Sequence, residues 1–229
     1  MLKIGVVLSG SGFQDGSEIQ ESVFTLYNLD AADVDIVCMA PNISQTRVIN
    51  HLTGQVTSET RNVLVESARI ARGNIKDIKD VNLADLDGVI FPGGFGAESS
   101  LSTFSENGTN CTVNPDIENL IKEMHKTKKP LGFICIAPVI AAKVLGSLEL
   151  DHKLKLTIGS DSDTAKAIHD MNATHEAKTV DDIEVDLENR VVSTPAYMTG
   201  PGPRDINKGI EKLVRQVLIM AETFKAERV

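Results

Sequence analysis

The 229-residue sequence is poor in basic charge and has no long apolar run, and each shortage excludes a class of protein. Its 32 acidic and 23 basic residues give a net charge of −9, and its longest basic cluster is the short stretch from Lys126 to Lys129. A nucleic-acid partner is therefore not expected. No apolar run approaches the roughly 20 residues that a membrane span needs, so no membrane partner is expected either.

Cysteine is also scarce. Cys38, Cys111 and Cys135 are too few and too scattered for a disulfide framework, and no Cys-x-x-Cys pair or His/Cys spacing typical of a metal site occurs. Cys38 falls in a predicted buried strand and is expected to be inert, whereas Cys111 is expected in an exposed loop. The chain begins with a strand and not with a signal peptide, which predicts a cytoplasmic protein, or an organellar one if a presequence is missing here.

Short apolar strands alternate with helices along the whole chain, and no linker or repeat divides it. This order predicts a single α/β domain over residues 1–229, with a doubly wound, mainly parallel sheet and helices on both faces. We expect strands over 4–8, 35–40, 88–91, the run ending at 135, 154–158, 183–187 and 190–193; an extended hairpin over 47–57; and helices over 17–31, 59–72, 115–126, 139–145, 163–171 and 205–225.

Cys135 stands where an apolar strand runs into a predicted helix. Pro138 marks the start of that helix, because proline is favoured in a first helical turn. Backbone N–H groups at a helix start carry partial positive charge, which favours a thiolate over a thiol. The alternative is an inert cysteine buried in the core.

Glycine-rich turns follow the strands that end at Leu8 and Phe91. In an open parallel sheet the ends of the strands form one edge, so these turns and Cys135 are expected to meet there. Gly93 and Gly94 suit either an oxyanion site built from backbone N–H groups or a tight turn without a catalytic role.

The first of these turns, Gly10-x-Gly12-x-x-x-Gly16, does not fit a dinucleotide fingerprint. Asp15 stands one residue before the last glycine, and its carboxylate would repel a pyrophosphate. The second strand also ends without an acid to hold a ribose. We therefore expect no cofactor.

Three further side chains are candidates for the same site. Glu18 and Glu21 lie three residues apart and share one face of the first predicted helix, either as acids at a helix start or with one of them facing Cys135. His51, in a small polar cluster, is the best candidate for the histidine base that an amidase would need. No His-x-Glu pair follows the cysteine, as a glutaminase triad would require.

Together these segments resemble the enhancing-lycopene-biosynthesis (ElbB) or sigma cross-reacting protein family. This family belongs to the DJ/PfpI branch of the class I glutamine amidotransferase-like superfamily. The resemblance covers nearly the whole chain and rests on Ser9-Gly10, Asp15 to Ile19, Val48 to Gly54, Glu59 to Leu64, Pro92 to Gly96, Gly132 to Pro138, Leu156 to Gly159 and Thr194 to Met198.

The resemblance implies a flavodoxin-like fold with a nucleophile elbow at Cys135. It also implies that Glu21 is the carboxyl group in contact with the thiolate, with Glu18 one turn away, and that the protein forms a homodimer. The superfamily's amidotransferase histidine is missing, so glutamine hydrolysis is not expected. Relatives resemble cofactor-free glyoxalases that convert glyoxal to glycolate.

The resulting hypothesis is a glyoxalase-like lyase that acts on a small carbonyl metabolite through the Cys135 thiolate. An oxyanion and the substrate would be held near Gly93, Gly94, Ile136 and His51, and a glutamate would relay the proton. This chemistry predicts a raised pKa for the glutamate and a lowered pKa for the cysteine. Two alternatives are a redox-sensing or protein-quality module without turnover, and a divergent amidase with His51 as its base.

Overall fold

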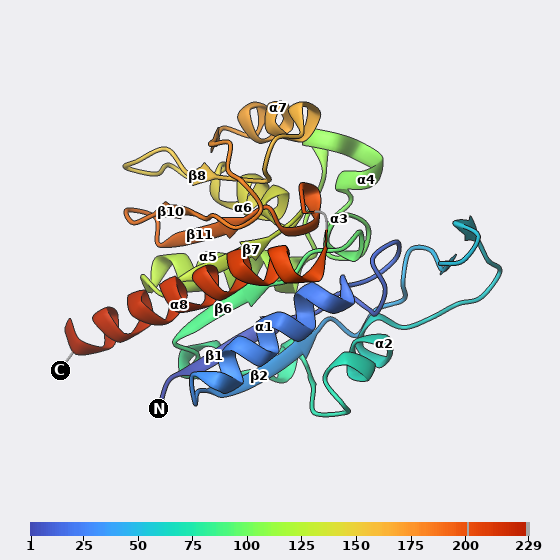
Figure 1. The fold of residues 1–229 in the computed structure, drawn as a ribbon, viewed down its shortest axis with the longest axis horizontal. Coiled ribbons are helices and arrows are strands. Elements are labelled where there is room, and N and C mark those ends of the chain that lie inside the picture. The colour runs from blue at the N-terminus through green and yellow to red at the C-terminus, as the bar shows by residue number, and fades with distance from the viewer. Residues whose placement is uncertain (201, 228–229) are drawn as a thin grey trace.

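The computed structural model describes residues 1–200 and 202–227 and has a seven-stranded sheet at its centre (Figure 1). Six strands run parallel, and β10 at one edge runs antiparallel to β11. The predicted doubly wound, mainly parallel fold is therefore confirmed. In spatial order the strands are β10 (Glu184–Asp186), β11 (Val191–Thr194), β7 (Leu131–Ile134), β6 (Gly88–Phe91), β1 (Lys3–Val7), β2 (Asp35–Ala40) and β5 (Lys76–Asp77).

The central strands β6 and β7 are buried at every position. A parallel sheet with helices on both faces needs such continuous burial, which explains the unbroken apolar runs in the sequence. Phe91 and Phe133 pair in register and stack with their ring centroids 4.9 Å apart. This contact fixes β6 and β7 side by side just before their functional ends.

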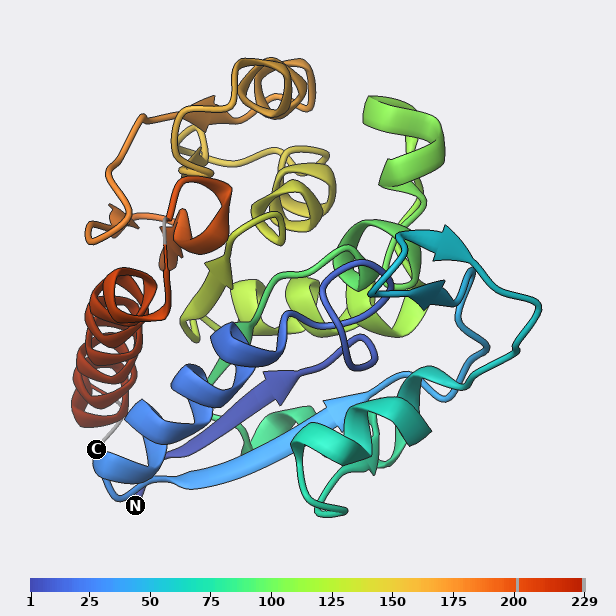
Figure 2. The same ribbon diagram turned by 45° about the vertical axis from the view of Figure 1, so that its right-hand side comes forward.

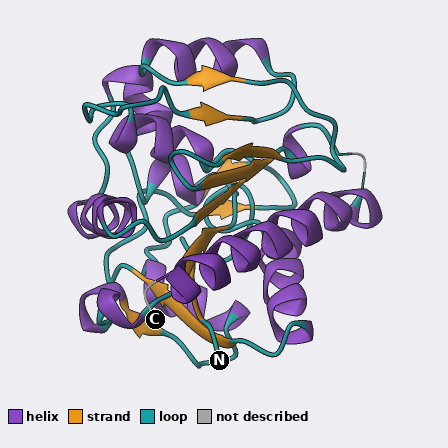
Figure 3. Ribbon diagram, turned by 90° about the vertical axis from the view of Figure 1, so that its left-hand side faces the viewer, coloured by secondary structure: helices purple, strands orange, loops and turns teal. Residues whose placement is uncertain are grey.

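Helices cover both sides of the strands, as Figure 3 shows. The helices α1 (Ile19–Ala31) and α8 (Pro203–Glu227) pack against each other across the front of the sheet in Figure 1. The chain advances along the sheet in one direction from β1 to β2 and in the opposite direction from β6 to β7. Because both crossovers are right-handed, α5 (Pro115–Lys126) lies on the face opposite α1, and α6 (Pro138–Leu145) packs beside α5. The remaining helices of four residues or more are α2 (Val63–Ile70), α3 (Gly96–Ser99), α4 (Phe104–Asn107) and α7 (Ser162–Asp170).

Two small sheets lie outside the main one. The predicted hairpin consists of β3 (Ile49–Asn50) and β4 (Gln55–Val56), and it projects from the body of the molecule (Figure 2). β8 (Lys155–Leu156) and β9 (Thr174–His175) form the second pair. The predicted strand over 154–158 is therefore shorter than expected and does not join the main sheet.

Two predictions are wrong for local reasons. The helix expected over 59–72 begins only at Val63, because the Asn62 side chain accepts a hydrogen bond from Val65 N–H and caps the helix there. Cys111 is only 2% exposed, although an exposed loop was expected. A bridge between Ser102 and Val113 folds that loop back on itself and encloses the thiol. None of the described helices is long and apolar enough to cross a membrane.

Candidate active site

The candidate site lies where the loops after β1, β6, β7 and β11 meet. These four strands are neighbours, so residues far apart in sequence come together at their carboxyl ends. Cys135 follows β7 directly and has a φ of 62°, a left-handed conformation that costs a cysteine roughly 1–2 kcal/mol. Its N–H donates to the carbonyl of Thr194 at 2.9 Å. The strained residue is thus held by the neighbouring strand end, as a nucleophile elbow requires.

Glu21 is the carboxyl group that contacts the cysteine. It lies in the first turn of α1, is fully buried, and forms a side-chain hydrogen bond with Cys135. Its Oε2 accepts from Gly93 N–H at 2.9 Å, and its Oε1 accepts from Tyr197 N–H at 3.2 Å. The carboxyl group therefore joins α1 to the loops after β6, β7 and β11.

Glu18 has a different position. It is the N-cap of α1, and its Oε2 accepts from the backbone N–H of Glu21 at 2.6 Å. Its own N–H donates to the Gly93 carbonyl at 2.9 Å. The side chain is half-buried and faces the same cavity as Cys135. Of the two candidate glutamates, Glu21 is thus hydrogen-bonded to the Cys135 sulfur, and Glu18 lines the cavity in front of that sulfur.

The pKa of Glu21 is raised to about 8. Burial is the main cause and the charge of Glu18 adds to it, whereas the hydrogen bonds to the carboxyl group oppose both. Glu21 therefore keeps its proton near neutral pH, in the direction that the sequence predicted. Burial also raises the pKa of Glu18, although hydrogen bonds from the first turn of the helix oppose this.

The pKa of Cys135 is raised well above its ordinary value, and the expectation of a lowered pKa is wrong. The main cause is burial, followed by the charge of Glu21 and the hydrogen bond to it. The N–H groups of Gly94 and Ile136 favour the thiolate, as expected at an elbow, but burial outweighs them. The pair thus loses its first proton near pH 8 and holds its second well above that.

Gly93 and Gly94 have separate roles. The N–H of Gly94 hydrogen-bonds to the Cys135 sulfur. The N–H of Gly93 was expected to bind a substrate oxyanion, but it donates its hydrogen bond to Glu21 instead. A Cβ at Gly93 would lie 2.5 Å from the Cys135 Cβ and 2.7 Å from the Glu21 Oε2. Glycine is needed there because the thiol and the carboxyl group approach the backbone so closely.

His51 does not reach the cysteine. Its Nε2 accepts from Gln14 N–H at 3.3 Å, its Nδ1 lies 3.1 Å from the Ile49 carbonyl, and its ring meets the edge of Phe13 at 5.5 Å. It is not among the residues that line the cavity around Cys135. The expectation that His51 binds substrate is therefore corrected: it supports the loop that carries Phe13.

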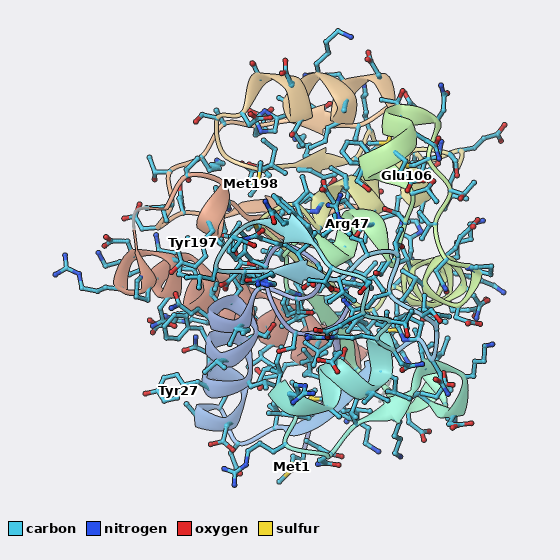
Figure 4. The ribbon with its side chains drawn as sticks, turned by 90° about the vertical axis from the view of Figure 1, so that its right-hand side faces the viewer. Met1, Tyr27, Arg47, Glu106, Tyr197 and Met198 are labelled. Carbon is cyan, nitrogen blue, oxygen red and sulfur yellow. The ribbon has the colours of Figure 1, made fainter. Side chains whose placement is uncertain are left out.

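A cavity of about 650 Å³ opens in front of Cys135. Figure 4 shows two of its lining residues, Tyr197 and Met198, next to each other near the first turn of α1. The sequence pattern did not predict these aromatic walls. Among the described residues, the lining includes no lysine, arginine or histidine and consists of Phe13, Glu18, Gln20, Gly94, Phe95, Cys135, Tyr197 and Met198.

Within residues 1–200 and 202–227, no group of three histidine, cysteine, aspartate or glutamate side chains is arranged to hold a metal ion. Around the cavity, the described residues provide the thiol of Cys135, the carboxyl groups of Glu18 and Glu21, and backbone N–H donors.

Comparison with known proteins gives clear relatives, although no family model matches the chain. The human glutamine amidotransferase-like class 1 domain-containing protein 3, mitochondrial, is 43% identical over 94% of this chain and 82% of its own length. The rat ES1 protein homolog, mitochondrial, is 41% identical over 94% and 83%. The crystal structure of an isoprenoid biosynthesis protein with an amidotransferase-like domain from Ehrlichia chaffeensis is 33% identical, with a TM-score of 0.89, and covers 96% of this chain and 99% of its own.

The chain has the fold of the DJ-1 and ThiJ/PfpI proteins, and its relatives place it in the class I glutamine amidotransferase-like superfamily. Schizosaccharomyces pombe DJ-1, at 17% identity and a TM-score of 0.57 over 99% of this chain and 98% of its own, shares the fold. Within the superfamily, the chain belongs to the family of ES1 and ElbB-like proteins, as the relatives above 30% identity show.

Proposed function

We propose that this protein is a cofactor-independent glyoxalase-like enzyme that converts a small reactive dicarbonyl to a hydroxy acid. The observation that carries the proposal is the hydrogen-bonded pair of Cys135 and Glu21 beside a cavity whose described lining has no cationic side chain. A thiol paired with a protonated carboxyl group suits addition to a neutral aldehyde. A cavity without positive charge suits an uncharged substrate.

The reaction needs no external oxidant or reductant. The Cys135 sulfur adds to one aldehyde carbon of glyoxal, and a proton passes from the pair to the carbonyl oxygen, giving a hemithioacetal. A proton leaves that carbon and returns to the neighbouring carbon, so the first carbon is oxidised to a thioester and the second is reduced to an alcohol. Water then hydrolyses the thioester, releases glycolate and regenerates the thiol.

The two glutamates have different parts in this scheme. Glu21 exchanges a proton with the sulfur and the new oxygen, because it is bonded to Cys135. Glu18 relays the proton between the two carbons, because its carboxyl group lines the cavity in front of Cys135. The N–H groups of Gly94 and Ile136, which reach the sulfur, also lie near the position of the new oxyanion.

The test is glycolate formation from glyoxal by the purified protein, followed by NMR. We expect Cys135→Ala to abolish turnover. Cys38→Ala is the matched control, because it removes a buried thiol in β2, away from the site. Equal turnover by wild type and Cys135→Ala would overturn the proposal.

A second candidate function is redox sensing by Cys135 without turnover. It is supported by the protonated Glu21, which can donate a hydrogen bond to a sulfinate formed on the neighbouring sulfur. Mass spectrometry after mild peroxide treatment tests it: selective sulfinic acid at Cys135, together with no glyoxal turnover, would favour this function. An amidase with His51 as its base is disfavoured, because His51 does not line the cavity.

We further propose that the protein acts as a homodimer. Ile19, Val23 and Tyr27 lie on one face of α1 at four-residue spacing and are about half exposed or more, and Leu52 on the projecting hairpin is 94% exposed. A hairpin of two strands is marginally stable by itself, so a second copy is a suitable cover for it. Light scattering tests this: the mass should be twice 24.7 kDa, and Val23→Glu should halve it.

The location of the protein is also a proposal. The names of the human and rat relatives describe them as mitochondrial, and we propose an organellar location for this chain too. Fractionation of cells that express the full-length gene tests this. Recovery only in the cytosolic fraction would contradict it.

A further inference from the structure

The cavity in front of Cys135 is much larger than glyoxal. Its volume is about 650 Å³, whereas glyoxal has four non-hydrogen atoms and a single water takes about 30 Å³ in the liquid. Cavities of 300–1,000 Å³ typically enclose ligands several times larger than glyoxal. The cavity therefore has room for a substrate that carries a substituent beyond the two carbonyl groups.

Two aromatic rings form one wall of this space. Phe13 and Phe95 are 48% and 40% exposed, and their ring centroids lie 6.1 Å apart. Phe95 N–H donates to the Phe13 carbonyl at 2.7 Å, and His51 packs against Phe13 from behind. The wall is thus fixed before any ligand arrives, and its exposed aromatic surface favours an apolar group.

A second part of the wall comes from the turn after β11. Tyr197 is held at both ends, because its N–H donates to Glu21 and its hydroxyl hydrogen-bonds to Gln20. Met198, the next residue, adds a flexible thioether that packs well against varied apolar groups. This turn places apolar surface directly beside the Cys135–Glu21 pair.

The charge of the cavity lining also limits which substrates can bind. The acidic side chain that faces the cavity is Glu18, and no lysine, arginine or histidine is found among the described lining residues. A carboxylate or phosphate on the substrate would lose water without gaining a counter-ion, which is unfavourable. The occupant is therefore both apolar and uncharged.

From these observations we infer that the site prefers α-oxoaldehydes that carry an apolar, uncharged substituent, such as an aryl or branched alkyl group, over glyoxal itself. This inference rests on the proposed function, since it uses the same addition of Cys135 to an aldehyde. Phenylglyoxal is the test substrate: with one water it gives mandelate, by the same internal transfer of a proton between two carbons.

The experiment compares kcat/KM for glyoxal, phenylglyoxal and 4-carboxyphenylglyoxal with the wild-type protein. We expect phenylglyoxal to exceed glyoxal at least tenfold, and the added carboxylate to reduce its kcat/KM at least tenfold. Phe95→Leu should lower the ratio of phenylglyoxal to glyoxal at least fivefold. Leu187→Ala is the control, because Leu187 is 67% exposed in the turn between β10 and β11, outside the cavity lining, and should change neither value.

A readout without turnover separates this inference from the proposed function. Acetophenone, which has no aldehyde, should slow iodoacetamide labelling of Cys135 at least threefold, whereas benzoate should not. Equal kcat/KM for glyoxal and phenylglyoxal, or no protection by acetophenone, would overturn the inference while Cys135-dependent glycolate formation still supported the proposed function. Protection by acetophenone without conversion of any aldehyde would overturn the proposed function and leave an apolar binding site.

Discussion

The carboxyl group of Glu21 and the thiol of Cys135 form a buried hydrogen-bonded pair that joins α1 to the turn after β7. Near neutral pH both groups are protonated, because burial raises both pKa values. Once one proton is lost, the remaining one is shared. The anion is then supported on the carboxyl side by the N–H groups of Gly93 and Tyr197 and on the sulfur side by those of Gly94 and Ile136.

Alkylation of Cys135 should accelerate with pH and level off above about pH 8. Below this value the pair carries both protons, and the thiolate fraction rises about tenfold per pH unit until the first proton is lost. Iodoacetamide kinetics followed by mass spectrometry measure this profile. In Glu21→Gln the plateau above pH 8 should disappear and labelling should keep accelerating with pH, because the carboxyl group that loses its proton near pH 8 is gone and the buried thiol titrates alone. A plateau already reached below pH 6 would contradict the prediction.

Glu21 should make folding stability depend on pH. In the folded protein it keeps its proton up to about pH 8, whereas its ordinary value is 4.5. Between these values the folded state binds one more proton than the unfolded chain, so this contribution is complete below pH 4.5 and is lost as pH rises through 8. The loss is about 1.4 kcal/mol per pH unit.

Urea unfolding of wild type and Glu21→Gln at pH 5, 6 and 7 gives the free energy of unfolding of each protein as a function of pH. The contribution of Glu21 is the difference between the slopes of these two plots. Glutamine does not titrate, so the variant lacks this contribution and all others remain common to both proteins. If the free energy of unfolding had the same pH dependence in both proteins, Glu21 would already be ionised in the folded state.

Only Cys135 should react quickly with iodoacetamide in the native protein. Burial raises the pKa of all three thiols, but Cys135 borders a cavity open to small molecules, whereas Cys38 lies within β2 and Cys111 is 2% exposed. We expect one label per chain at pH 8, and three in urea, by intact-mass measurement. Early labelling of Cys38 in β2 would indicate local opening of that part of the sheet.

Gly93→Ala should destabilise the protein and disrupt the site. Its new Cβ would lie 2.5 Å from the Cys135 Cβ and 2.8 Å from the Ile134 carbonyl oxygen, and a backbone atom does not move away easily. We expect a loss of about 2–3 kcal/mol in the free energy of unfolding. Gly202→Ala is the control, because within the described part of the chain no atom beyond its two sequence neighbours lies within 4 Å of a Cβ placed there; its thermal midpoint should stay close to wild type.

Much of the fold could be predicted because buried parallel strands have a simple signature. The strands that end at Val7, Phe91 and Ile134 are short apolar runs followed by glycine or cysteine turns, and they lie where the sequence placed them. The short elements were missed for a physical reason. The edge strand Lys76–Asp77 has two polar residues and pairs with β2 alone, so no apolar pattern reveals it.

The site was predictable only in part. Cys135 could be inferred from its place at a strand-to-helix turn, but the residue pattern left Glu18 and Glu21 as alternatives, and only the family resemblance favoured Glu21. The Gly93 N–H could not be assigned to Glu21, nor His51 to Phe13, because such pairings depend on how two distant loops meet. The sign of the cysteine pKa was missed for a related reason: burial depends on the whole fold, whereas the N–H donors near the sulfur can be seen in the local sequence.

The first turn of α1 also limits how the chain can vary in length. Glu18 caps this helix and Glu21 enters the site from the same turn, so the direction of the buried carboxyl group is set by the rotation of about 100° that each residue adds. One extra residue between them would turn the carboxyl group away from Cys135 or force the helix to start elsewhere. The projecting β3–β4 hairpin carries no group of the Cys135–Glu21 pair, so insertions there leave the pair intact. Natural length variation should therefore be found in that hairpin and not between residues 18 and 21.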